Sequence, residues 1–292
     1  MSKIVFFILA TLTSCILSAK SWSDILQDKY SLISDPSLKI IIEQHQRFVS
    51  NTTPSIANPV IKNIEIIENN QPLVDIFSVN SNRISMLPTP LKNKAFYSPD
   101  CNSGLPSASK IRKEVYLKLE KMVVYLDELA EDFGYKSGEV SIKVFEGLRD
   151  LESQAKLFKD KLEEIKLKYP NLTAEEAEVE TSKWISPVKN NIPVHSTGAA
   201  IDIRLWSNSA NDFIDLGKFG AIWGENNNAQ TFSEGITDIQ KLNRLYMLIA
   251  ATKAGLVNYS YEYWHFSFGD RYFVYWQEDD INTKTAYYGP IS

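Results

Sequence analysis

Apolar residues recur at intervals of three and four along several stretches of the chain, which is the spacing of one face of a helix. This repeat predicts a short amphipathic helix over 38–48, which includes His45 as a packing or surface residue. A longer repeat predicts a helix from Ile111 to Leu129, capped by Ser107 or Ser109 and closed by Gly134.

The helical repeat returns later in the chain. Residues 151–165 predict a helix that Pro170 ends. Thr173 and Glu176 have the spacing of a capping box and predict the start of the next helix. A last periodic stretch predicts a helix over 238–253.

Between these helices, β-branched and aromatic runs predict strands, and Val140 to Val144 alternate as a half-buried strand would. The expected strands cover 60–67, 72–77, 140–144, 200–205 and 257–268. The short strands near the C-terminus have tight connections. We therefore expect an α+β fold in which helices pack on a small, mainly antiparallel sheet.

Two of these strands carry polar residues in apolar surroundings. Asp202 is expected to share a face with Ala200, whose small side chain leaves room for a ligand. Residues three apart on a regular strand point to opposite faces, so Glu262 and His265 can face one site only if the backbone is distorted between them. We predict that distortion at residues 263–264.

Composition is that of an ordinary globular protein, with 292 residues, 44% hydrophobic and 23% charged. The net charge of -5 and the lack of a basic stripe argue against nucleic acid as the main partner. Lys3, the apolar run of residues 4–17 and the small pair Ser18-Ala19 follow the order of a signal peptide. The run is too short for a stable membrane span, so we predict an exported protein, periplasmic or secreted, cleaved after Ala19.

A different processing route also fits the N-terminus, because residues 12–15 resemble a lipobox ending in Cys15, which would make a lipoprotein anchored through that residue. Under plain secretion, Cys101 is the sole thiol of the mature chain and is interpreted as structural. After the signal peptide of residues 1–19, we expect an N-terminal extension with a short helix at 20–59 and one catalytic domain at 60–292. Residues 207–235 are rich in Gly, Asn and Ser and predict a long loop that could rim a substrate cleft.

The chemistry is concentrated in two short segments. The chain has three histidines, and two of them, His195 and His265, lie near carboxylates. Imidazole and carboxylate are the ligand types of a hydrolytic zinc site, so His195, Asp202 and His265 are candidate ligands and Glu262 a candidate base. The spacing alone leaves open that these are ordinary hydrogen-bonding residues.

The same segments resemble the zinc D-alanyl-D-alanine dipeptidases of the vancomycin-resistance type, with the related D,D-carboxypeptidases and L-alanyl-D-glutamate peptidases. The pattern of this family is Ser-x-His-x-x-Gly-x-Ala-x-Asp, followed by Glu-x-x-His. The matching positions here are His195, Gly198, Ala200, Asp202, Glu262, Trp264 and His265, together with Gly147-Leu148-Arg149, Pro72 to Asp75 and Trp264 to Asp270.

The resemblance implies one Zn²⁺ per chain on His195, Asp202 and His265, in a domain of the Hedgehog and D,D-peptidase type. It implies that Glu262 acts as the base and that Arg149 stabilises the oxyanion. The substrate implied is a small peptide, D-Ala-D-Ala or a similar cell-wall peptide. The oligomeric state is left open.

Two departures from the family concern the substrate. The family serine two residues before the first histidine is Pro193 here. The family's Met-Gly-x-x-Phe-Asp segment, whose acid holds the substrate ammonium, is replaced by Leu216-Gly217-Lys218-Phe219-Gly220, which lacks the acid. Asp215 or Glu225 is a candidate substitute.

These departures leave two alternatives to a dipeptidase. The first is a D,D-carboxypeptidase or endopeptidase that acts on longer peptidoglycan stem peptides. The second, from a different class, is a non-catalytic zinc-containing module that binds cell wall. Glu262 argues against that module, because a structural zinc site has no use for a base.

Overall fold

The structure is a computed structural model that describes residues 19–35, 38–87, 106–182, 184–217, 227–277 and 284–291. The predicted signal segment before Ala19, both cysteines and Glu225 lie outside these residues. Within them, no helix is long and apolar enough to cross a bilayer.

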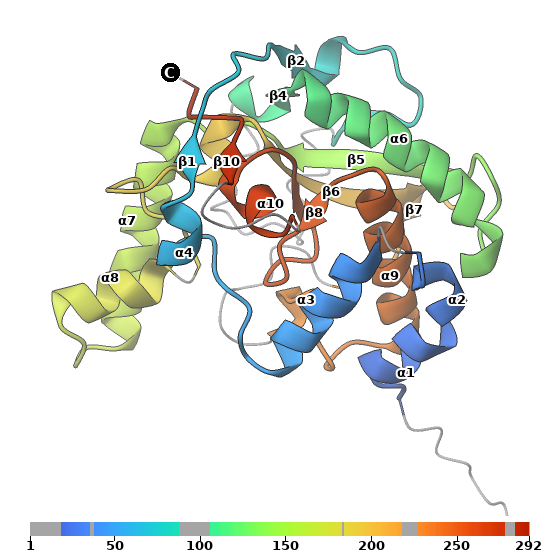
Figure 1. Cartoon of the computed structure of the whole chain (residues 1–292), viewed down its shortest axis with the longest axis horizontal. Coiled ribbons are helices and arrows are strands. Elements are labelled where there is room, and N and C mark those ends of the chain that lie inside the picture. Colours follow the sequence, from blue (N-terminus) through green and yellow to red (C-terminus); the bar gives the residue numbers. More distant parts are fainter. Residues whose placement is uncertain are drawn as a thin grey trace, which may run out of the picture.

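Four short helices open the described chain, and helices and short strands are mixed along the rest of it (Figure 1). The α-helices are α1 (Trp22–Asp28), α2 (Tyr30–Ile33), α3 (Lys39–Val49), α4 (Pro59–Lys62), α6 (Lys113–Leu129), α7 (Leu151–Lys168), α8 (Ala174–Ser182), α9 (Asp238–Lys253) and α10 (Arg271–Tyr275). The strands are β1 (Glu65–Ile66), β2 (Leu73–Asp75), β3 (Ile84–Met86), β4 (Lys110–Arg112), β5 (Val140–Glu146), β6 (Ala200–Ser207), β7 (Asp212–Phe213), β8 (Val257–Asn258), β9 (His265–Ser267) and β10 (Thr285–Ala286).

The main sheet has the order β3-β5-β6-β9-β8, and β7 pairs with β6 beside this path. Only the pair β3–β5 is parallel in this sheet; the β5–β6, β6–β7, β6–β9 and β8–β9 pairs are antiparallel. The predicted α+β fold with a small, mainly antiparallel sheet is therefore confirmed. Two smaller sheets, β1–β10 and β2–β4, lie outside the main one.

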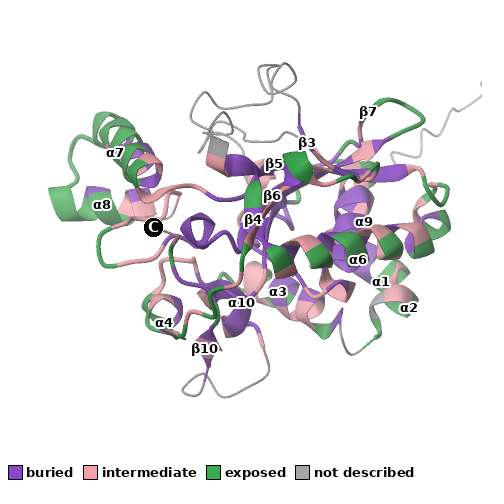
Figure 2. Ribbon diagram, turned by 90° about the horizontal axis from the view of Figure 1, so that it is seen from above, coloured by how far each residue is buried: buried purple, intermediate pink, exposed green. Residues whose placement is uncertain are grey.

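The helices α6 and α9 pack against each other, and Figure 2 places both on the same side of β5 and β6. Ile201, Ile203 and Leu205 of β6 are fully buried and belong to the cluster that these helices complete. Asp202 alternates with them and faces the other way, as the strand period requires. The sheet thus separates the apolar core on one face from the polar residues, such as Asp202, on the other.

The N-terminal helices α1 to α3 share this core with the rest of the molecule. Trp22, Ile25 and Ile41 are all buried in the same cluster as the residues of β6 and α9. The Trp22 indole Nε1 also donates a hydrogen bond to Ser233 O at 2.9 Å. The helices α1 and α3 are therefore part of the main core.

The predicted strand over 60–67 is largely wrong. The Asn58 side chain accepts a hydrogen bond from Val60 N at 3.0 Å, and Pro59 occupies the first turn, so the chain forms α4 instead. The strand is confined to β1. The strand predicted at 72–77 is likewise shortened to β2, because Asp75 caps a 3₁₀ turn that starts at Ile76.

Two details of the predicted helices also differ. Helix α6 follows β4 directly, and its N-cap position is Arg112, without a side-chain cap, so neither Ser107 nor Ser109 caps it. The face of α7 that is buried is Gln154, Leu157, Lys161 and Ile165. The capping box of Thr173 and Glu176 is present before α8.

Residues 257–268 do not form the single strand that was predicted. They form the antiparallel pair β8 and β9, joined by a turn over 259–264. The predicted backbone break before His265 is present: His265 N donates to Glu262 O at 3.1 Å. Glu262 thus lies in the turn, and the alternation of a strand no longer separates it from His265.

Candidate metal and catalytic site

Three acidic or imidazole side chains form one row across three neighbouring strands. Asp202 of β6 is paired with His265 of β9 on one side and with Glu146 of β5 on the other. Paired residues of adjacent strands project on the same face. Glu146 joins this face because a bulge between Val144 and Glu146 shifts the register, and otherwise it would follow Val144 into the core.

His195 reaches the row from the 3₁₀ turn Val194–Thr197 that precedes β6. Gly198 closes this turn with a φ of +68°, where a Cβ would also lie 2.9 Å from Leu73 Cδ2, so glycine is required. His195 Nδ1 lies 2.8 Å from Gly147 O. Because a carbonyl only accepts, Nδ1 donates this bond and Nε2 is left facing Asp202 and His265.

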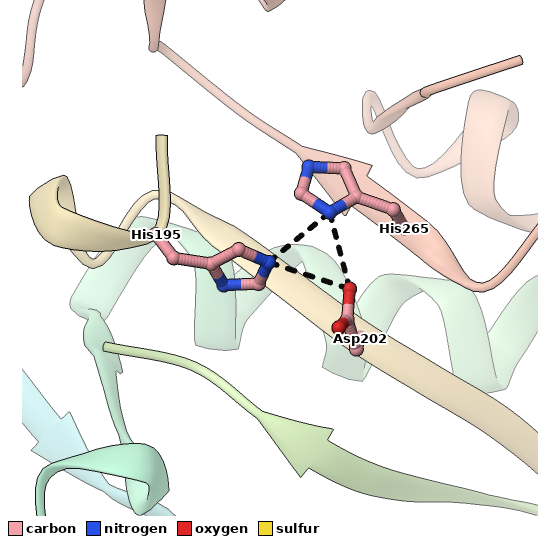
Figure 3. A group of neighbouring side chains, drawn as sticks. All are labelled: His195, Asp202 and His265. Atoms are coloured by element: carbon pink, nitrogen blue, oxygen red, sulfur yellow. Dashed lines mark hydrogen bonds and ion pairs between the residues drawn. The ribbon is translucent and has the colours of Figure 1, made fainter. Parts of the chain in front are cut away.

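The three predicted ligands converge (Figure 3), with ligand atoms that lie within 4.8 Å of one another. His195 Nε2 is 3.1 Å from His265 Nδ1 and 3.5 Å from Asp202 Oδ1, and His265 Nδ1 is 3.1 Å from Asp202 Oδ1. A tetrahedral zinc site with bonds of ~2.0–2.1 Å has ligand-to-ligand edges of roughly 3.3 Å. The donor set and its spacing therefore fit a zinc ion.

The electrostatics of this cluster also favour a cation. His195, Asp202 and His265 are all buried. Burial opposes charge on Asp202, but the charge of His195 and hydrogen bonds from both histidines lower its pKa well below the ordinary value. Burial lowers the pKa of His265, against the opposing effect of its hydrogen bond with Asp202. Burial also acts against charge on His195, yet the charge of Asp202 and its hydrogen bond raise the pKa of this imidazole overall.

Glu262 lies beside the ligand cluster, with Oε2 3.7 Å from His265 Nδ1. Burial and the negative charge of Asp202 raise the pKa of Glu262 to about 8. A carboxyl group with a pKa near neutrality can both accept and return a proton. Its place in the β8–β9 turn therefore puts a proton-transfer group next to the metal position.

Arg149 is held at the pocket by two acceptors. Its Nε and Nη2 bind both carboxylate oxygens of Glu146 at 2.8 and 2.5 Å, and its Nη1 donates to Gln154 Oε1 at 2.9 Å. Sequence reasoning missed Glu146 and Gln154. The signal for Glu146 was its position directly before Gly147-Leu148-Arg149.

The pocket around these groups draws its lining from many parts of the chain. Its walls are Ile56, Ala57, Gln154, Ser182, Trp184, Ile185, Ser186, Pro193, Val194, Tyr259 and Trp264, and its polar end is Arg149, His195, Asp202, Glu262 and His265. The described parts of the 207–235 loop do not contribute to it. Asp215, one of the candidate partners for a substrate amine, is not among the lining residues and accepts from Gln240 Nε2 at 3.0 Å instead.

Two histidines, an aspartate and a protonatable glutamate in one buried pocket define the site of a metal-dependent hydrolase. The chain belongs to the D-Ala-D-Ala dipeptidase family (Peptidase M15), whose model matches residues 136–283. It is a zinc metallopeptidase of this family. The matched region contains all three metal ligands predicted from the sequence, Glu262 and Arg149, whereas residues 20–59 lie outside it.

Two solved structures resemble the chain at 16% sequence identity. One is the vancomycin-resistance D,D-pentapeptidase VanY of a VanB-type cassette, an alanine mutant in complex with Zn(II); the match covers 61% of this chain and 85% of that one, with a TM-score of 0.32. The other is VanYB in complex with D-alanine-D-alanine, covering 55% of this chain and 71% of that one, with a TM-score of 0.30. Among curated proteins no relative matches.

Proposed function

We propose that the protein is an exported zinc peptidase that hydrolyses D-alanyl-D-alanine or a similar short cell-wall peptide. The observation that carries this proposal is the convergence of His195, Asp202 and His265 beside Glu262, in the pocket of a chain that belongs to this peptidase family. The apolar run and small residues that precede Lys20 support export. The mass of the mature N-terminus distinguishes cleavage after Ala19 from an acylated Cys15.

His195, Asp202 and His265 hold the metal in this proposal. Zn²⁺, when bound, supplies an activated water and polarises the scissile carbonyl. Glu262 takes a proton from the attacking water and delivers it to the amine that leaves. The high pKa of Glu262 in the buried pocket suits this exchange, because the group can hold the proton between the two transfers.

Arg149 supplies positive charge at the pocket wall, where negative charge develops on the carbonyl oxygen. Its guanidinium is 11% exposed and is fixed by Glu146 and Gln154, so it is aligned before substrate binds. The hydrogen bond from Arg149 N to His195 O, at 3.1 Å, ties this arginine to the turn that carries a metal ligand.

A second candidate activity is cleavage of longer stem peptides. A dipeptidase needs an acid to hold the free ammonium of its substrate. Among the residues that the structure describes in the pocket, the carboxylates are Asp202 and Glu262, which the mechanism already uses. This observation favours a substrate whose amino end is acylated, as it is in a stem peptide.

The test is a panel of D-Ala-D-Ala and a pentapeptide stem, assayed with and without a chelator. We expect cleavage that the chelator abolishes. Glu262→Gln should retain zinc by metal analysis but lower kcat by about 10²–10⁴-fold, because it removes the proton carrier and no ligand. Glu178→Gln, an exposed position on α8, serves as the control. Cleavage of the stem alone assigns the second candidate, and bound zinc with no turnover on any peptide overturns both.

A further inference from the structure

One wall of the catalytic pocket comes from a segment that the family model does not cover. Residues 53–58, here called the strap, connect α3 to α4 and appear as the blue connection between these helices in Figure 1. Ile56 and Ala57 of the strap line the pocket together with the metal-site residues. The matched region begins at residue 136, so the strap lies outside it.

The strap is fastened to the turn that carries Glu262. The Tyr261 hydroxyl donates to Thr53 O at 2.9 Å, and Ile56 packs against the apolar cluster that includes Tyr259. The Tyr259 ring in turn packs edge-on against His265, with ring centroids 5.7 Å apart. The strap therefore contacts the turn that carries Glu262 at two points. A single residue, Tyr259, separates the strap from the metal ligand His265.

Both ends of the strap are anchored as well. Before it, Gln44 of α3 is buried and its Nε2 donates to Asn258 O at 2.8 Å. After it, Asn58 caps α4, and Ile61 packs in the apolar cluster that includes Tyr259 and α10. A short segment fixed at each end and in the middle keeps its place when a substrate presses on it.

Other residues that line the pocket are apolar too. They are Trp184 and Ile185 after α8, and Pro193 and Val194 before His195. The water-accessible volume of the pocket is about 80 Å³. A pocket with apolar sides, a polar end and so little space fits a peptide bond flanked by small, apolar side chains.

We propose that the strap is a substrate-contacting wall and that Ile56 is a specificity-determining residue, which limits the side chains beside the scissile bond to the size of alanine. This inference rests on the proposed peptidase function. The reason is steric: Ile56 occupies the volume that a longer side chain would need, and a fixed apolar wall discriminates by single methylene groups.

The test compares kcat/KM for D-Ala-D-Ala peptides and for analogues in which either alanine is replaced by valine or leucine. Ile56→Ala should raise the ratio of kcat/KM for the larger analogue over the alanine peptide by at least about tenfold. Ala57→Leu adds volume to the same wall and should shift the ratio in the opposite sense. Val60→Ala is the matched control, because it removes methyl groups from an adjacent residue that is 43% exposed and does not line the pocket.

The outcomes separate this inference from the proposed function. If the native protein cleaves no peptide of the panel, the proposed function fails. If the native protein cleaves but both strap variants keep its substrate ratio, only the strap inference fails. Ile56 also packs against the apolar cluster that includes Tyr259, so a purely structural role would lower kcat/KM for all peptides by one factor. Zinc content and thermal unfolding of each variant identify such a uniform loss, and a uniform loss counts against the inference.

Discussion

The two sides of the catalytic pocket are built by different means. On the sheet side, Asp202 and His265 are held by the register of β6 and β9, and each is buried. On the rim side, Arg149, the loop after α8 and the strap are held by side-chain hydrogen bonds, local for Arg149 and between segments distant in sequence for the loop and the strap. Backbone pairing thus fixes the relative positions of Asp202 and His265, while the rim can change independently of that pairing.

The largest effect should come from breaking the sheet side. Asp202→Ala removes the carboxylate that lies within 3.5 Å of both histidine nitrogens, so zinc binding and hydrolysis should both be lost. Metal analysis and the peptide assay measure the two losses together. Gln154→Ala on the rim is the comparison, because it contacts Arg149 and should leave the zinc content unchanged. An Asp202→Ala protein that keeps stoichiometric zinc would contradict the assignment.

A smaller effect is expected from the rim. Arg149→Lys keeps the charge but loses the bidentate pair with Glu146, so kcat should fall by about 10²–10³-fold while zinc is retained. Arg83→Lys is the matched control, since Arg83 forms a comparable paired contact with Asp127, and neither residue lines the pocket. Equal loss of activity in both variants would show that Arg149 acts only through stability.

The smallest effect is expected on the free energy of unfolding, at Asp270 on the sheet side of the pocket. Catalysis should be unchanged. Asp270 caps α10 just after β9, and burial raises its pKa from 3.8 to about 6. The folded protein therefore keeps a proton that the unfolded chain releases, so this group's contribution to stability is full below the unfolded pKa and is lost as pH rises through about 6. A shift of about two pH units corresponds to roughly 3 kcal/mol.

Asp270→Asn removes this ionisation and keeps a side chain that can cap the helix. The free energy of unfolding of the variant minus that of the native protein should therefore rise by about 3 kcal/mol between pH ~4 and pH ~7. Urea unfolding at both pH values gives this difference. Asp212→Asn, at an exposed position, should show no such trend. A difference that is constant with pH would mean that Asp270 is solvated in the folded state.

The contrast between the sheet side and the rim side of the pocket also explains which features could be predicted from the sequence. The residue types of His195, Asp202 and His265, in two short segments, indicated a metal site, and the resemblance of those segments to the peptidase family was needed to choose it over ordinary hydrogen bonding. The alternation of residues 140–144 and 200–205 likewise predicted β5 and β6 correctly. Both strands are buried on both faces, so the half-buried character predicted for residues 140–144 is wrong although the strand itself is correct.

The failures have equally physical causes. The apolar, β-branched run at 60–67 suggested a strand, but Asn58 and Pro59 begin a helix there, and tertiary packing of Ile61 and Ile64 outweighs strand propensity. The role of Glu146 depends on a bulge, and no periodic pattern shows a bulge. The strap reaches the pocket through a hydrogen bond between Thr53 and Tyr261, 208 residues apart. A contact between residues so far apart produces no pattern within a short stretch of sequence.

The direct pairing of Asp202 with His265 has one further consequence. The pairing of β6 with β9 sets the separation of the two side chains. The coordination geometry therefore does not depend on the length of the sixty-odd residues between them. Loops between the two strands can therefore gain or lose residues, provided that the pairing register of β6 and β9 is unchanged. The parts of this segment that must stay are those with other tasks: α9 in the core, β8 beside β9, and the turn that carries Glu262.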